Sequence, residues 1–102
     1  MENILEETKN IMRRYNIKPN KSLGQNFLIN SEVVENIVQS SDITKDDMVI
    51  EIGPGLGVLT KYLLEKAKKV VCIELDTKMV KILQDRFSEY DNIEIINTDV
   101  LK

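Results

Sequence analysis

A single stretch decides the fold predicted for this chain: Val49–Thr60, with the sequence VIEIGPGLGVLT. Ile50 and Ile52 are β-branched and apolar, which is typical of a strand that is buried on both faces. The three glycines remove side chains where the backbone must turn sharply and come close to a bound molecule. The helix expected after them directs free backbone N–H groups and a partial positive charge at the loop. This order of strand, glycine loop and helix predicts a site for a nucleotide or a nucleoside.

Strands and helices are expected to alternate from residue 48 onward. The apolar runs predict strands at Met48–Ile52, Val70–Ile73 and Ile93–Ile96. One helix is expected from the glycine loop to about Ala67, and another begins at Asp76 or Thr77. Right-handed crossovers then give a parallel sheet with the strand order 3-2-1. The fold class is therefore α/β, as the first β-α-β-α-β half of a doubly wound sheet.

The preceding residues form a helical N-terminal extension. Residues 2–15 have the spacing of an amphipathic helix, and Pro19 ends any helix before it. An irregular segment follows, and a second helix runs from Asn30 or Ser31 to about Ser40. We expect residues 1–47 and 48–102 to belong to one domain, of which residues 48–102 hold the ligand.

Composition excludes several classes of function. The 102 residues contain no histidine and a single cysteine, Cys72, so a zinc site is very unfavourable and none is predicted. We also expect no membrane span, no secretory signal and a cytoplasmic location. Net charge is only −3, yet residues 9–24 carry five basic side chains and no acid. That segment is a candidate phosphate-contacting surface, although a solvated helix face explains it equally well.

Two acids follow the other strands. Glu74 lies about 20 residues after Gly53, a spacing typical of a carboxylate that accepts hydrogen bonds from ribose hydroxyls. Asp99 follows the third strand and can accept a hydrogen bond from the exocyclic amine of a base. Either acid alone could be a surface acid or a turn residue. Together at one edge of the sheet, behind a glycine loop, they favour a ligand that contains adenosine.

Two cofactors of that kind compete. A dinucleotide requires the pattern G-x-G-x-x-G, but Val58 occupies the position of its third glycine. Pro54 also removes a backbone donor that a pyrophosphate would use. S-adenosylmethionine has no phosphate, and the loop then needs only to turn and approach a methionine moiety. The loop therefore favours S-adenosylmethionine.

Four segments together resemble the ribosomal RNA adenine dimethyltransferase family, and in particular its enzymes for small-subunit ribosomal RNA. They are KSLGQNFL at residues 21–28, EIGPGLG at residues 51–57, ELD at residues 74–76 and NTDV at residues 97–100. The resemblance implies a Rossmann-like S-adenosylmethionine methyltransferase fold, with small-subunit ribosomal RNA as the partner. The cofactor-binding residues that it implies, together with the loop glycines, are Asn26, Leu28, Gly53, Gly55, Glu74, Leu75, Asp99 and Val100. Glu51 would either orient the glycine loop or approach the ammonium group of the cofactor. The basic residues considered for RNA contact are Arg13, Arg14, Lys18 and Lys21.

The family's catalytic segment, Asn-Leu-Pro-Tyr or Asn-Leu-Pro-Phe after a fourth strand, is absent from these 102 residues. We therefore expect an N-terminal portion with no catalytic residue of its own, and self-association through the unpaired edge of the first strand. Three alternatives remain open at this point. They are the related large-subunit methylase of the macrolide-resistance type, a nicotinamide-dependent oxidoreductase domain, and an inactive cofactor-binding fragment.

Overall fold

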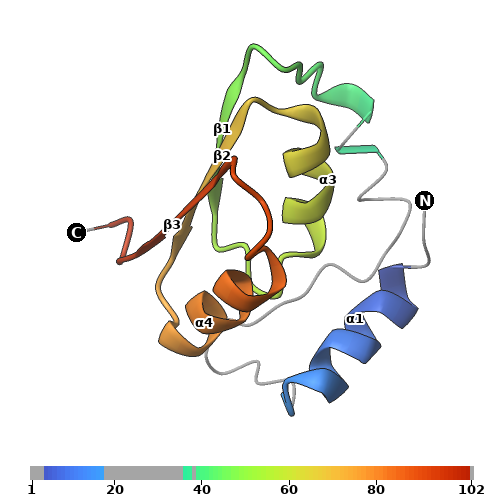
Figure 1. The fold of residues 1–102 in the computed structure, drawn as a ribbon, viewed down its shortest axis with the longest axis vertical. Coiled ribbons are helices and arrows are strands. Elements are labelled where there is room, and N and C mark those ends of the chain that lie inside the picture. Colours follow the sequence, from blue (N-terminus) through green and yellow to red (C-terminus); the bar gives the residue numbers. More distant parts are fainter. Residues whose placement is uncertain (1–3, 18–35, 38, 102) are drawn as a thin grey trace.

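The structure is a computed structural model that describes residues 4–17, 36–37 and 39–101. In chain order the elements are α1 (Ile4–Arg14), β1 (Met48–Ile52), α3 (Val58–Lys66), β2 (Lys69–Glu74), α4 (Thr77–Arg86) and β3 (Ile93–Asn97) (Figure 1). This succession confirms the predicted alternation of strands and helices. Residues 36, 37, 39 and 40 are also helical, in agreement with the helix predicted to end near Ser40.

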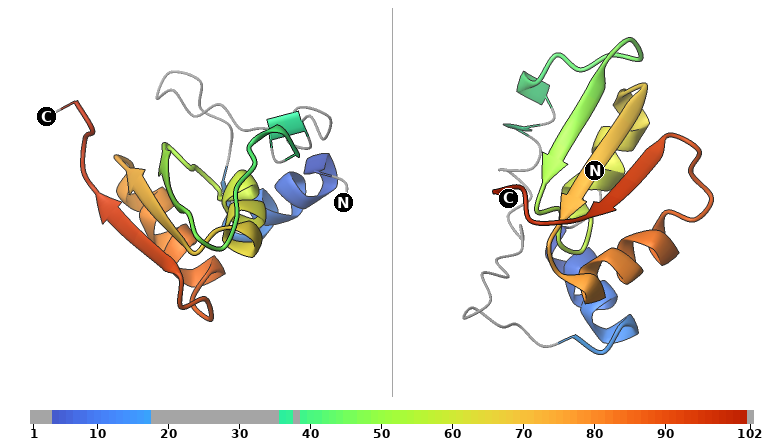
Figure 2. Two further views of the ribbon diagram at one scale, coloured as in Figure 1. Left: turned by 90° about the horizontal axis from the view of Figure 1, so that it is seen from above. Right: turned by 90° about the vertical axis from the view of Figure 1, so that its left-hand side faces the viewer.

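The three strands form one parallel sheet in the order β1-β2-β3, as predicted. Ile52 of β1 lies beside Ile73 of β2, which in turn lies beside Ile96 of β3. Both crossovers run in the same direction, so α3 and α4 lie on the same face of the sheet (Figure 2). The carboxyl ends of all three strands consequently point toward one edge.

Two apolar clusters hold these layers together. One lies between the sheet and its helices and consists of Leu63, Leu64, Ala67, Val70, Cys72, Leu83 and Phe87. The other attaches α1 to the glycine loop and to both helices, and consists of Ile11, Ile17, Leu56, Val58, Met79 and Ile82. The glycine loop therefore packs against both α4 and α1.

One prediction about β1 is wrong. Ile50 and Ile52 were expected to be buried on a strand covered on both faces, but each is 61% exposed. Alternation along the strand turns Val49 and Glu51 toward the helices and the two isoleucines away from them. Among the described residues β1 is also an edge strand. Self-association through that edge remains a prediction.

Positive φ angles explain the three glycines of the loop: +67° at Gly53, +60° at Gly55 and +82° at Gly57. Their surroundings differ. A Cβ atom on Gly57 would lie 2.7 Å from the Phe87 ring and 2.9 Å from the Leu83 side chain, whereas one on Gly53 would meet no atom of the described residues within 4 Å. Gly57 is therefore required for packing against α4, whereas no described residue packs against the corresponding position of Gly53.

We predict that Gly57→Ala lowers the free energy of unfolding by roughly 2–4 kcal/mol, because left-handed strain adds to overpacking against α4. Gly53→Ala should cost only about 1 kcal/mol, since it introduces backbone strain without a clash. Urea unfolding of both variants beside the parent chain measures the difference. Equal losses would contradict the packing role of Gly57.

Candidate functional site

The glycine loop, Glu74 and Asp99 lie at the same edge of the sheet, each at or after the end of a strand. Hydrogen bonds connect these strand ends directly. The Gly53 N–H donates to the Ile73 carbonyl at 2.9 Å, and the Thr98 N–H donates to the Glu74 carbonyl at 3.1 Å. The edge is thus one continuous surface built from three loops.

Glu74 lies at the centre of this edge, and its carboxylate accepts two backbone hydrogen bonds. Oε1 accepts a hydrogen bond from the Gly55 N–H at 3.0 Å, and Oε2 accepts one from the Asp76 N–H at 2.9 Å. The residue is 7% exposed. Each carboxylate oxygen has a further lone pair, so Glu74 can brace the loop and still accept a hydrogen bond from a ligand hydroxyl.

Asn97, to which the sequence alone assigned no role, connects the third strand to Glu74. Its Nδ2 donates to the Glu74 carbonyl at 2.9 Å and to the Leu75 carbonyl at 3.1 Å. An amide side chain at the last position of a mostly apolar strand is the sequence signal that points to such a role. Asn97 therefore fixes the backbone on both sides of the Glu74 side chain.

Apolar side chains are exposed at the same edge. Leu75 is 66% exposed and Val100 is 47% exposed, directly after β2 and in the turn after β3. Asp99, which directly precedes Val100, is half-buried, and its Oδ1 accepts a hydrogen bond from the Leu101 N–H at 2.9 Å. Asp99 is thus a turn residue as well as a candidate ligand contact. Exposed apolar side chains beside a carboxylate suit a flat, partly polar ligand such as a base.

Glu51 points away from this edge, toward the helices. Its Oε1 accepts a hydrogen bond from Thr60 Oγ1, and the thiol of Cys72 lies 3.9 Å away. Of its two expected roles, these contacts favour orientation of the loop, since Thr60 belongs to the first turn of α3. Burial raises the pKa of Glu51, while the hydrogen bonds from Thr60 and Cys72 oppose that rise. Burial also raises the pKa of the Cys72 thiol to about 12, so Cys72 is an unreactive core residue.

The predicted RNA contacts are only partly described. Arg13 and Arg14 are exposed at the end of α1. Arg13 donates to Asn10 Oδ1 at 2.6 Å, and Arg14 lies 3.5 Å from a carboxylate oxygen of Asp85. Lys18 and Lys21 lie outside the described residues, and so do the predicted cofactor contacts Asn26 and Leu28.

In residues 4–17, 36–37 and 39–101, no group of three or more acidic, cysteine or histidine side chains could hold a metal ion. Across those same ranges, no helix has the length and apolar character needed to cross a membrane.

The raised pKa of Glu51 predicts how stability depends on pH. The folded chain binds this proton more tightly than the unfolded chain, so Glu51 stabilises the fold at pH values below its ordinary pKa of 4.5. That contribution is lost as the pH rises through the folded-state pKa. Glu51→Gln cannot titrate and keeps an acceptor for Thr60, so its stability relative to the parent chain should increase from pH 4.5 to pH 7.

Chemical unfolding of the parent chain and of Glu51→Gln across this pH range measures the effect. Glu65→Gln, on the exposed side of α3, is the matched control. The same pH dependence in the Glu51 variant and in the parent chain would rule out this account of the buried carboxyl group.

The family described as ribosomal RNA adenine dimethylase matches residues 16–102. The ribosomal RNA small subunit methyltransferase A of Alkaliphilus metalliredigens is 52% identical over 96 residues, which cover 94% of this chain and 33% of that protein.

Two solved structures are similar in fold and sequence. A 23S rRNA methyltransferase, ErmE, matches with a TM-score of 0.70 and 35% identity over 76% of this chain and 32% of its own. A dimethyladenosine transferase from Plasmodium falciparum matches with a TM-score of 0.68 and 36% identity over 72% of this chain and 27% of its own.

The chain thus spans about a third of the length of the curated relatives that it matches. The family match, over residues 16–102, includes the glycine loop and the strand ends around Glu74. This chain belongs to the ribosomal RNA adenine dimethylase family.

Proposed function

We propose that this chain is the cofactor-binding part of an enzyme that uses S-adenosylmethionine to dimethylate adenosines of small-subunit ribosomal RNA. The observation that carries the proposal is the Glu74 carboxylate, fixed against the glycine loop at the carboxyl edge of a parallel sheet. The names of the relatives support the reaction: one is a ribosomal RNA small subunit methyltransferase, and another is a dimethyladenosine transferase.

The loop fits the methionine part of this cofactor. A Cβ atom at Gly53 would meet no atom of the described residues within 4 Å, so a ligand can approach the backbone closely from that side. The Gly55 N–H is already bound by Glu74, which leaves this loop poorly suited to a pyrophosphate that needs several free N–H donors. These features support S-adenosylmethionine over the dinucleotide of an oxidoreductase.

The edge beside the loop fits the adenosine part. In the proposed complex the Glu74 carboxylate accepts hydrogen bonds from the ribose hydroxyls through its remaining lone pairs. Leu75 and Val100, both exposed, flank the adenine ring, and Asp99 accepts a hydrogen bond from the adenine amine. Asn26 and Leu28 remain proposed contacts from outside the described residues.

When bound, the cofactor supplies a methyl group that its sulfonium already activates. The residues of this chain hold and orient it, and positioning together with exclusion of water provides most of the rate enhancement in such a transfer. We assign no catalytic residue to this chain.

Small-subunit ribosomal RNA is the proposed substrate, and the cytoplasm the proposed location. The relative that is 52% identical is named for the small subunit, whereas the 23S methyltransferase is 35% identical. The exposed arginines Arg13 and Arg14 at the end of α1, with Lys18 and Lys21, are proposed to contact phosphates.

Binding of S-adenosylhomocysteine, measured by titration calorimetry, tests the cofactor. We expect binding of this compound and none of NADH, and NADH binding alone would refute the assignment. Glu74→Ala should weaken S-adenosylhomocysteine binding at least roughly ten-fold, because a charged acceptor contributes about 1.5–3 kcal/mol. Glu65→Ala, an exposed acid on α3, is the control and should bind as the parent chain does.

Methyl transfer tests the substrate. We expect a protein that carries this chain and has the full length of its relatives to transfer labelled methyl groups to unmodified small ribosomal subunits. Digestion of that RNA should yield dimethyladenosine, and large subunits should remain unlabelled. Labelling confined to large subunits would instead establish the macrolide-resistance type of methylase.

A further inference from the structure

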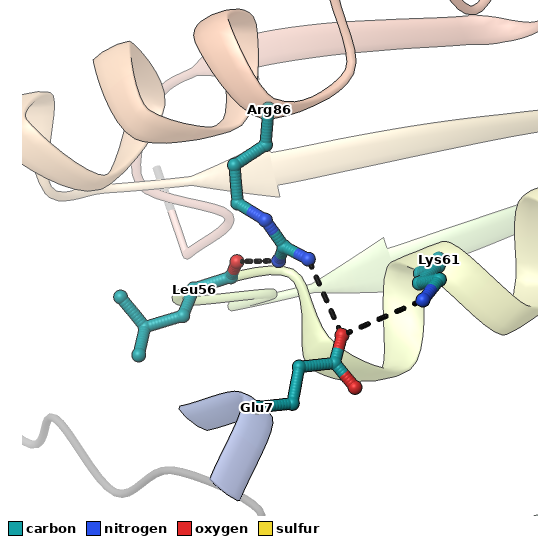
Figure 3. Close-up of polar contacts among 4 residues, drawn as sticks. All are labelled: Glu7, Leu56, Lys61 and Arg86. Atoms are coloured by element: carbon teal, nitrogen blue, oxygen red, sulfur yellow. Dashed lines mark hydrogen bonds and ion pairs between the residues drawn. The ribbon is translucent and has the colours of Figure 1, made fainter. Parts of the chain in front are cut away.

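Arg86 directs its guanidinium group at the glycine loop. It occupies the last turn of α4, where a cation normally interacts with the C-terminal carbonyls of its own helix. Here Nη1 donates to the Leu56 carbonyl in the middle of the loop, and Nη2 lies 3.5 Å from Glu7 Oε1 (Figure 3). The side chain is only 11% exposed. One guanidinium thus contacts the loop on one side and α1 on the other.

Glu7 holds this guanidinium from α1. Its Oε1 is shared between Arg86 and Lys61, whose Nζ lies 3.9 Å away on α3 (Figure 3). The Glu7 side chain is 11% exposed, and within the described part of the chain its Oε2 atom is buried without a hydrogen-bond partner. A buried carboxylate is costly unless it is paired, so Glu7 and Arg86 each depend on the other to remain in place.

Packing leaves the guanidinium little freedom. Its centre lies 4.8 Å from the centroid of the Phe87 ring, and a Cβ atom on Gly57 would lie 3.0 Å from Nη1. Burial lowers the pKa of Arg86 and the Glu7 carboxylate opposes this effect, so the charge is retained. The planar, charged guanidinium of Arg86 is therefore held at a fixed position between α4 and the loop.

The loop itself requires such a constraint. Leu56 lies between Gly55 and Gly57, which have φ angles of +60° and +82°. Glycines reach many conformations in the absence of restraint, and a charge-assisted hydrogen bond to the carbonyl between them selects one. Glu74 fixes the loop at the Gly55 N–H, and Arg86 fixes it one residue further on.

We propose that Arg86 is a positioning residue for the cofactor site, which holds the glycine loop in its binding conformation through the Leu56 carbonyl, and that Glu7 makes this hold depend on the docking of α1. The ligand in this proposal is that of the proposed function. Docking of α1 and binding of the cofactor are then coupled, and each strengthens the other.

The experiment compares Arg86→Gln, Arg86→Lys and Glu7→Gln with Lys81→Gln, an exposed control on the same helix. Amide hydrogen exchange is followed at Gly57, whose N–H donates to the Pro54 carbonyl at 3.0 Å, and at Cys72 in the central strand. Cys72 reports global unfolding, and Gly57 reports the loop. Titration calorimetry with S-adenosylhomocysteine is performed at a temperature at which each variant is folded.

For Arg86→Gln we expect exchange at Gly57 to accelerate about ten-fold more than at Cys72, and S-adenosylhomocysteine to bind about ten-fold more weakly. Arg86→Lys should recover global stability, because an ammonium group still pairs with Glu7. It should not restore slow exchange at Gly57, because a single ammonium cannot also donate to the Leu56 carbonyl in the same geometry. Glu7→Gln keeps a neutral hydrogen-bond acceptor on α1, so exchange at Gly57 should accelerate by a smaller factor than in Arg86→Gln. Lys81→Gln should match the parent chain.

Equal acceleration at Gly57 and Cys72 would reduce Arg86 to a residue of general stability and overturn the proposal. If Arg86→Gln does not fold, Arg86→Lys and Glu7→Gln decide by the same comparison. Failure of the parent chain to bind S-adenosylhomocysteine would refute the proposed function, whereas the exchange measurement needs no cofactor and decides the role of Arg86 by itself.

Discussion

The carboxylate of Glu74 accepts one hydrogen bond from the Gly55 N–H and one from the Asp76 N–H, and the rest of the site depends on this pair. The first joins β2 to the glycine loop after β1, and the second orders the turn into α4. The carbonyl of the same residue accepts hydrogen bonds from Asn97 Nδ2 and the Thr98 N–H, which brings in the end of β3. Three separate loops thus become one rigid edge, because a single residue at the end of the central strand satisfies donors from all of them.

The glycine loop has two unlike sides. At Gly53 no described residue fills the space beside the backbone, which is the condition for close approach of a ligand. At Gly57 that space is filled by Phe87, Leu83 and Arg86, so the absence of a side chain serves contact within the protein. The G-x-G-x-G pattern therefore meets two physical requirements, which are ligand approach at the first glycine and packing within the protein at the last. The packing at the last glycine shows how closely α4 approaches the loop. That approach gives Arg86 access to the Leu56 carbonyl.

Local sequence pattern predicted the helices and strands, because their causes are local. Apolar runs indicated the strands, and Asp76 caps α4 by accepting hydrogen bonds from the N–H groups of Lys78 and Met79. The sequence pattern did not predict the polar contacts of Arg86 with Leu56 and Glu7, because both partners are distant from Arg86 in the sequence. Nor did it predict the complete burial of Thr60, whose hydroxyl donates a hydrogen bond to the Glu51 carboxylate. Such pairings depend on tertiary structure and leave no periodic signal.

The two acids at the ends of β1 and β2 show how strand geometry separates roles within one motif. Glu51 lies one residue before the last position of β1, so alternation turns it under α3, where its hydrogen-bond donors are a hydroxyl and a thiol. Glu74 is the last residue of β2, beside the loop, where two backbone N–H groups bind its carboxylate. Hydroxyl and thiol donors compensate burial incompletely, and the pKa of Glu51 rises accordingly. The acid within the glycine motif therefore supports the turn, while the acid of the neighbouring strand is the one that we propose to contact the ligand.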